Sequence, residues 1–148
     1  MAIVNTPVSQ TYARFLSLVW SYFLPASITA STGGGAVTLT AAQVLGGLLV
    51  VDTQDAQTAT LPTATLLAAA LPGGVQVGSS VLFYVRNVGD STLTIAVGTG
   101  ITSATGNTLT VATVSTRMFL LRCTAVALSS DPASAYTFTL YSIGVSAH

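Results

Sequence analysis

The titratable side chains of this chain are few, and their types limit the chemistry that it could perform. The 148 residues include four arginines, four aspartates, one cysteine and one histidine, but no lysine or glutamate. A Ser-His-Asp arrangement needs a histidine beside the nucleophile, and the single histidine, His148, is the last residue. A zinc site needs several cysteine or histidine ligands. The sequence therefore predicts no catalytic triad and no metal centre.

Two aspartates, Asp52 and Asp55, stand close enough in the sequence to be considered as oxygen ligands for calcium. An EF-hand-like loop needs more ligands at fixed spacing, so we interpret both as turn-forming residues. Any two of the four aspartates could meet in space as a general acid and base, but no pattern favours a pair. The glycine-rich stretches at 32–36 and 98–100 match neither a phosphate-binding loop nor a dinucleotide fingerprint. We expect no enzyme activity and no cofactor.

The composition is unusual because only 5% of the residues are charged while 51% are hydrophobic, and the net charge is zero. Ordinary soluble domains have about 25% charged residues. Four scattered arginines cannot supply the phosphate contacts of a nucleic-acid site or a polybasic membrane-surface site. We therefore expect a protein that packs among copies of itself or partners, and that binds neither nucleic acid nor a membrane.

The N-terminal stretch before Pro25 is rich in aromatic residues, which recur at the spacing of a short helix. Its apolar run is about half the length of a membrane span, and it lacks the basic region of a secretory signal. The helix could cap its own domain, but the flexible joint at 31–35 favours an arm that docks on a neighbouring subunit. Aromatic side chains anchor interfaces, and the predicted interface residues are Tyr12, Phe15, Leu16, Val19, Trp20, Tyr22 and Phe23.

From Ala36 onward the pattern is that of short β-strands separated by turns. Leu93, Ile95 and Val97 alternate with threonines, as in a sheet with one covered face, whereas 117–126 is almost continuously apolar. The spacing predicts an all-β fold, an antiparallel, jelly-roll-like β-sandwich, over residues 36–148, preceded by a helical or extended arm over 1–35. The expected strands are 36–40, 48–52, 58–62, 79–88, 92–97, 108–114, 117–126 and 135–144.

One Ala/Leu-rich stretch interrupts the strands and predicts a single short helix. Pro62 fits the entry of the helix, Thr63 its N-cap, and the sequence Pro-Gly-Gly at 72–74 its end. Because two helical turns are unstable alone in water, we expect Leu66, Leu67 and Leu71 to pack on a sheet. The helix then closes an open end of the sandwich, which is a structural role.

The stretch from Leu45 to Gly144 resembles a small β-sandwich module of structural proteins in tailed bacteriophages and large DNA viruses. The resemblance rests on "LPTA" at Leu61–Ala64, "VG" at 77–78, the "F-x-V-x-N" strand at Phe83–Asn87 and the "GTGIT" turn at Gly98–Thr102. It implies a virion component: a minor capsid, cement or decoration protein, or a fibre head, often trimeric. The expected partners are further copies of the chain, as a homotrimer, and the major capsid protein or other virion proteins.

The leading functional hypothesis is therefore a structural virion protein that acts by self-association and by docking on a capsid lattice. The alternative is a fibre or spike head that binds a host receptor or glycan, with Tyr84, Tyr136 and Tyr141 stacking on sugar rings; cross-strand packing of these tyrosines is the simpler interpretation. Arg86 and Arg122 interrupt apolar strands and could pair with Asp90 or Asp52, or reach across a subunit boundary. Cys123 is interpreted as a small buried hydrophobic residue.

Overall fold

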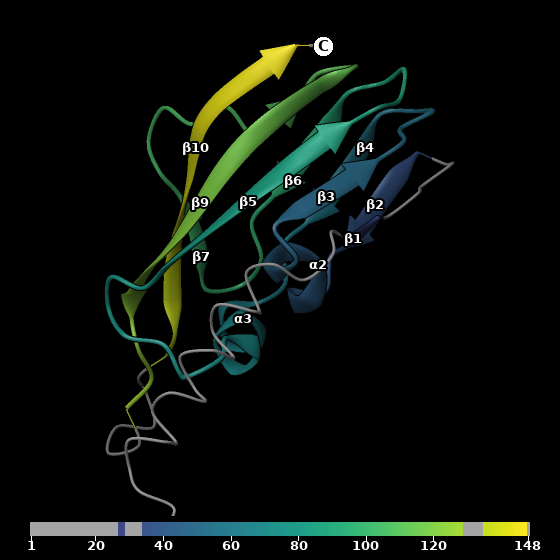
Figure 1. Ribbon diagram of the computed structural model, residues 1–148. Helices are drawn as coiled ribbons and strands as arrows, with labels where there is room; N and C mark the ends of the chain where they lie inside the picture. The colour runs from purple at the N-terminus through teal and green to yellow at the C-terminus, as the bar shows by residue number, and fades with distance from the viewer. Residues whose placement is uncertain (1–26, 29–33, 129–134, 148) are drawn as a thin grey trace, which may run out of the picture.

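The computed structural model describes residues 27–28, 34–128 and 135–147, which form two β-sheets and two short helices (Figure 1). Sheet A has six strands in the order β1 (Ser27–Ile28), β3 (Leu48–Val51), β5 (Ser80–Asn87), β9 (Ser115–Ala125), β10 (Thr137–Ala147) and β7 (Ile101–Ser103). Sheet B has four, in the order β2 (Gly35–Thr38), β4 (Gln57–Thr60), β6 (Leu93–Ala96) and β8 (Thr110–Val111). The predicted β-rich fold is confirmed.

The pairing of the strands corrects the expected antiparallel arrangement, because both sheets are mixed. Within the described residues, β1, β3 and β5 pair in parallel, as do β2, β4 and β6, and β7 pairs in parallel with β10. Antiparallel pairing is found for β5 with β9, β9 with β10, and β6 with β8. A jelly roll is built from antiparallel strands, so the jelly-roll-like connectivity is not confirmed.

The parallel pairs arise because the chain passes alternately between the two sheets from β2 to β6. Each return to a sheet adds a strand that runs in the same direction as the previous one. Gly35 of β2 pairs with Gln57 of β4, and Gln57 pairs with Leu93 of β6. The passage from β4 to β6 is longer than that from β2 to β4 because it contains α3 (Ala64–Ala70). The Ala/Leu stretch thus lies in the connection between β4 of sheet B and β5 of sheet A.

The sequence signals that predict α3 act as expected. The Thr63 hydroxyl accepts a hydrogen bond from the Leu66 amide at 3.3 Å, which caps the first turn. Leu67 is buried and Leu71 packs against the core, but Leu66 is 57% exposed, so its predicted packing on a sheet is wrong. With only two turns, α3 has a single narrow stripe that faces the core.

A second short helix, α2 (Ala41–Leu45), adds to the single helix that the sequence predicts between its strands. Its N-terminus carries a capping box: the Gln43 amide donates to the Thr40 hydroxyl at 3.2 Å, and the Thr40 amide donates to Gln43 Oε1 at 2.8 Å. Reciprocal capping satisfies amides that a five-residue helix would otherwise leave without partners. Val44 is buried and fixes the helix on the core.

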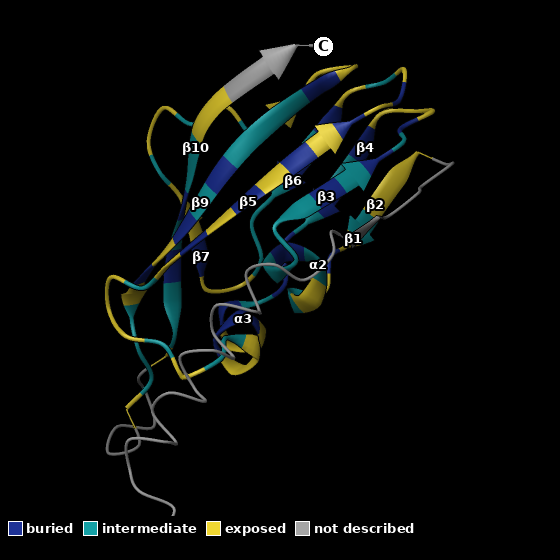
Figure 2. Ribbon diagram, in the orientation of Figure 1, coloured by how far each residue is buried: buried dark blue, intermediate teal, exposed yellow. Residues whose placement is uncertain are grey.

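The hydrophobic core lies between the sheets and draws side chains from both. In β5 every second residue is buried, from Val81 through Asn87, as the alternation of colours in Figure 2 shows. The rings of Phe83 and Phe119 stack at the centre, with centroids 5.4 Å apart. Leu93 and Ile95 face them from sheet B and are completely buried. This core fixes which face of each strand points outward.

Cys123 belongs to this core, which confirms its interpretation as a small buried hydrophobic residue. Its thiol donates a hydrogen bond to the Ala125 carbonyl at 3.2 Å. Burial raises the pKa of the Cys123 thiol, because the thiolate would lose its hydration inside the core. The thiol is therefore neutral and shielded rather than reactive.

Candidate functional site

The predicted interface residues, from Tyr12 to Phe23, lie outside the described residues. The arm expected over residues 1–35 is described only at β1 and at residues 34 and 35, and β1 pairs with β3 at the edge of sheet A. Candidate surfaces must therefore be sought on the two sheets and the helices that pack against them.

The outer face of sheet A carries a contiguous group of apolar side chains, which we call the apolar face. Cross-strand register places Leu82, Leu120 and Tyr141 in one row, because directly paired residues point to the same side of a sheet. The adjacent row is Leu48, Tyr84 and Met118. The apolar face thus comprises Leu48, Leu82, Tyr84, Met118, Leu120 and Tyr141.

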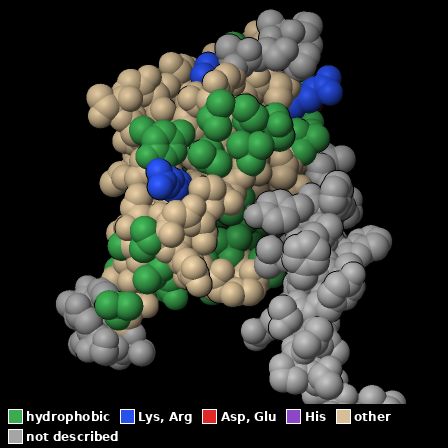
Figure 3. All heavy atoms as spheres, turned by 60° about the vertical axis from the view of Figure 1, so that its left-hand side comes forward, with side chains coloured by type: hydrophobic (Ala, Val, Ile, Leu, Met, Phe, Trp, Pro, Cys, Tyr) green, Lys and Arg blue, Asp and Glu red, His purple; other side chains and the backbone are tan. Residues whose placement is uncertain are grey.

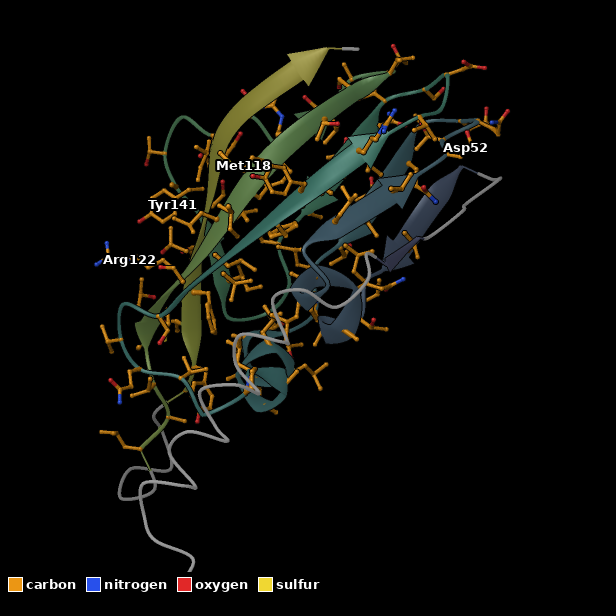
Figure 4. The ribbon with its side chains drawn as sticks, in the orientation of Figure 1. Asp52, Met118, Arg122 and Tyr141 are labelled. Atoms are coloured by element: carbon orange, nitrogen blue, oxygen red, sulfur yellow. The ribbon has the colours of Figure 1, made fainter. Side chains whose placement is uncertain are left out.

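The figures show this group from two directions. In Figure 3, which brings the β9 and β10 side forward, hydrophobic side chains gather into a patch with arginine side chains beside it. In Figure 4, Met118 of β9 and Tyr141 of β10 lie over neighbouring strands, while Asp52 lies at the far side of the molecule. Leu82 is 40% exposed and Tyr84 is 41% exposed. Large apolar patches on a protein surface mark interaction sites.

Two arginines border the apolar face. Arg86 is paired with Thr116 in the row beyond Tyr84, and Arg122 is paired with Ser80 in the row beyond Leu82. Both arginines are exposed. Neither forms an ion pair within the part of the chain that the structure describes, so the pairing with Asp90 or Asp52 considered from the sequence is not found. Their charges remain available to a partner.

Arg117, in contrast, has a structural role between strands. Its Nε donates to the Thr110 carbonyl at 2.8 Å, and its Nη1 donates to the Ser142 hydroxyl at 2.9 Å. The guanidinium therefore connects β8 of sheet B with β10 of sheet A. The guanidinium of Arg117 thus donates its hydrogen bonds to acceptors within the chain.

The outer face of sheet B is different, because it presents threonines, which we call the threonine face. In β4, Thr58 and Thr60 alternate with the buried Gln57 and Ala59. Register aligns Thr58 with Thr94, and Thr94 with Thr110, across three strands, and aligns Thr38 with Thr60. Within the described chain, none of these five threonine hydroxyls makes a hydrogen bond. The face is uncharged but offers donors and acceptors.

A buried polar cluster around Asn87 joins the two sheets at the ends of β3 and β5. Asn87 Nδ2 donates to the carbonyl of Ser91 at 2.7 Å and to those of Val111 and Ala112 at 3.3 and 3.2 Å. Its Oδ1 accepts from the Thr53 hydroxyl at 2.8 Å and from the Gly89 amide at 3.1 Å. The asparagine of the "F-x-V-x-N" motif is thus a fully satisfied clamp rather than a reactive group.

The glycines that follow the motif strands are also explained by close packing. A Cβ at Gly89 would lie 2.1 Å from the Thr53 backbone nitrogen, and one at Gly98 would lie 2.3 Å from the Leu61 carbonyl oxygen. Neither position has room for a side chain, so glycine is required at both because another backbone segment passes close by.

The remaining groups considered from the sequence are scattered. Among the described residues, no three His, Cys, Asp or Glu side chains come together as metal ligands would. Asp52 Oδ1 accepts a hydrogen bond from Gln54 Nε2 at 2.9 Å, as in a turn. Tyr84 and Tyr141 share the apolar face, but Tyr136 packs against the core. The three tyrosines therefore do not form one sugar-stacking surface.

A shallow apolar hollow lies beside the helices, where the end of β2 meets α2 and α3. It is lined by Thr38, Leu39, Thr40, Ala41, Leu66, Ala69 and Ala70. Among the described residues, no charged or titratable side chain lines it. In the described part of the chain, neither helix is long and apolar enough to cross a membrane.

Comparison of the chain with protein-family models, with curated protein sequences and with solved structures finds no match to any of them.

Proposed function

We propose that this chain is a structural virion protein that works by packing against copies of itself and against a shell protein. The observation that carries the proposal is the absence of charged residues on the outer face of sheet B, the threonine face, among the described residues. The apolar face is bordered by two arginines, the threonine face has no charged residue, and neither face carries a carboxylate. The resemblance of residues 45–144 to virion modules supports the proposal that the chain is part of a virion.

Uncharged faces of this kind fit assembly because the centres of protein interfaces are depleted of charged residues. A specific interface buries roughly 1,600 Å² in total, and obligate ones are larger. The threonine face suits such a contact, since it is formed by short in-register strands and carries hydroxyls without partners in the described chain. Those hydroxyls can exchange hydrogen bonds with water for bonds across a subunit boundary. A trimer, the arrangement expected from the resemblance, is the assembly we propose.

The test is the oligomeric state of the chain, measured by size-exclusion chromatography with light scattering. We expect the natural sequence to form an oligomer, and the variant Thr94→Lys, which places a charge at the centre of the threonine face, to dissociate it. The matched control is Gln76→Lys, which adds the same charge at an exposed position of the β4–β5 connection. A natural chain that stays monomeric at high concentration would contradict the proposal.

The alternative function, a fibre or spike head that binds a glycan, is favoured by one observation only. Tyr84 and Tyr141 lie on the same outer face of sheet A, in adjacent rows. A glycan array probed with the natural chain and with the double variant Tyr84→Ala/Tyr141→Ala tests it. Binding that the double variant loses would support a receptor-binding head, and an array without hits would discard it.

A further inference from the structure

The part of sheet A that carries the apolar face is apolar on both sides, and this pattern is typical of a sheet that is covered on both sides. The inner face of β5 packs in the core through Val81, Phe83 and Val85, while its outer face contributes Leu82 and Tyr84 to the apolar face. We propose that the segment Phe15–Leu24 of the same chain covers the apolar face. This inference goes beyond the proposed function and does not rest on it.

The composition of the segment requires a covering surface. Eight of its ten residues are apolar or aromatic, the exceptions being Ser17 and Ser21. The spacing of its aromatic residues predicts a helix, and a helix that is hydrophobic on all sides must be buried. The apolar face offers the complementary surface, because its members are large side chains on four adjacent strands.

The length of the connecting chain favours the segment's own sheet over that of a neighbour. Ser27 of β1 pairs with Leu49, directly beside Leu48 at the margin of the apolar face. Leu24 precedes Ser27 by three residues, which span at most about 11 Å. A connection of three residues is therefore short enough for the segment to reach the apolar face of its own chain.

The dimensions also agree. The apolar face extends from β3 to β10, and four strands at the usual spacing cover about 14 Å. A helix of ten residues is about 15 Å long. The segment can therefore cross the whole apolar face from the β1 edge.

Charge argues against a second copy of the same face as the cover. Two apolar faces packed together would bring Arg86 and Arg122 of one copy towards the same arginines of the other, without a carboxylate to offset them. The segment Phe15–Leu24 contains no charged residue. Its aromatic rings can instead lie against the two guanidinium groups, because the face of an aromatic ring attracts a cation.

The single tryptophan, Trp20, makes the proposal testable in the full chain. We expect its fluorescence emission to be blue-shifted relative to N-acetyltryptophanamide and protected from acrylamide quenching. The variant Leu120→Asp, which charges the apolar face, should shift the emission to that of the free amide. Leu66→Asp, on the exposed side of α3, is the matched control and should leave it unchanged.

Folding of each variant is checked by circular dichroism, and the milder Leu82→Ala serves if Leu120→Asp does not fold. Leu82→Ala should increase the quenching of Trp20, whereas Leu66→Ala should not. Trp20 emission equal to that of the free amide in the natural chain would overturn the proposal, as would emission that neither change at the apolar face affects.

Dilution distinguishes docking of the chain's own segment from docking of a segment that belongs to a neighbouring copy. Shielding of Trp20 that persists at concentrations where light scattering shows a monomer supports docking within one chain. Shielding that is lost on dilution, in parallel with dissociation, would overturn this proposal in favour of a neighbour's segment while leaving the proposed function intact. Conversely, a monomeric natural chain with a shielded Trp20 would contradict the proposed function and support the inference.

Discussion

Sheets A and B share one core but present opposite chemistry to their surroundings. The inner faces of both are apolar, with Phe83 and Phe119 on one side and Leu93 and Ile95 on the other. The outer face of sheet A is apolar and bordered by arginines, whereas that of sheet B carries threonines. In the arrangement that we propose, sheet A lies between two packed layers, whereas the outer face of sheet B offers uncharged polar contacts to a further subunit.

The largest predicted effect concerns adjacent residues on the two faces of β5. Replacing Phe83 with alanine should lower the free energy of unfolding by about 4 kcal/mol, because it removes one ring of the central stack and leaves a cavity. Leu82→Ala, on the outer face, should cost about 1–2 kcal/mol, since a cover over an outer face is less tightly packed than the core. Urea denaturation of both variants measures this, and equal costs would contradict the distinction between the faces.

The next effect concerns the cluster that joins the sheets. Asn87→Ala should cost roughly 3 kcal/mol, because it removes a completely buried side chain and leaves several buried polar groups without partners. The comparison variant is Asn107→Ala: this side chain donates to the Leu140 carbonyl at 2.6 Å but is only partly buried. The melting temperature of Asn87→Ala should be well below that of Asn107→Ala. The reverse order would show that the hydrogen bonds of Asn87 contribute less to stability than those of Asn107.

A smaller effect distinguishes the outer faces directly. Leu120→Thr, which gives sheet A an outer residue like those of sheet B, should destabilise the full chain by about 1–2 kcal/mol through lost apolar contact. Thr94→Val on sheet B should change stability by less than about 0.5 kcal/mol, as surface substitutions usually do. Both are measured by chemical denaturation. If the two substitutions cost the same, sheet A is as open to water as sheet B.

The smallest effect lies in the turn that joins the two sheets. Val114 precedes β9 with φ of 47°, a conformation that is costly for a β-branched residue. Val114→Gly should raise the free energy of unfolding by about 0.5 kcal/mol, because glycine adopts this conformation without strain. Thermal unfolding checks it, with Val77→Gly, at an exposed valine outside the strands, as the control. A destabilised Val114→Gly would mean that the valine makes contacts that outweigh the strain.

Much of the local structure could be predicted from the sequence. The strand expected over 79–88 corresponds to β5, and Thr63 with Pro62 predicted the start of α3. The direction of pairing could not be predicted, since a short alternating strand has the same pattern in parallel and antiparallel sheets. Direction here depends on the passage of the chain between the two sheets. The strand β7 was also missed, because Ile101–Ser103 lies among turn residues.

The candidate surfaces were only partly visible in the sequence. The threonines of 92–97 indicated a sheet with one covered face, and the apolar run of 117–126 carried the opposite signal. Register was needed to bring Leu48, Tyr84 and Met118 into one row, since they lie on three strands far apart in the chain. The role of Asn87 also required the structure, because its partners Thr53, Gly89 and Val111 come from three separate segments of the chain.

The oxidation of Met118 tests most directly whether the outer face of sheet A is covered. Its side chain belongs to the apolar face, and Met1 is the only other methionine of the chain. Treatment of the full chain with hydrogen peroxide, followed by peptide mass spectrometry, measures the rate of sulfoxide formation at Met118 against added free methionine. We predict strong protection in the natural chain and its loss in Leu120→Asp. Oxidation of Met118 at the rate of free methionine in the natural chain would contradict a covered sheet A.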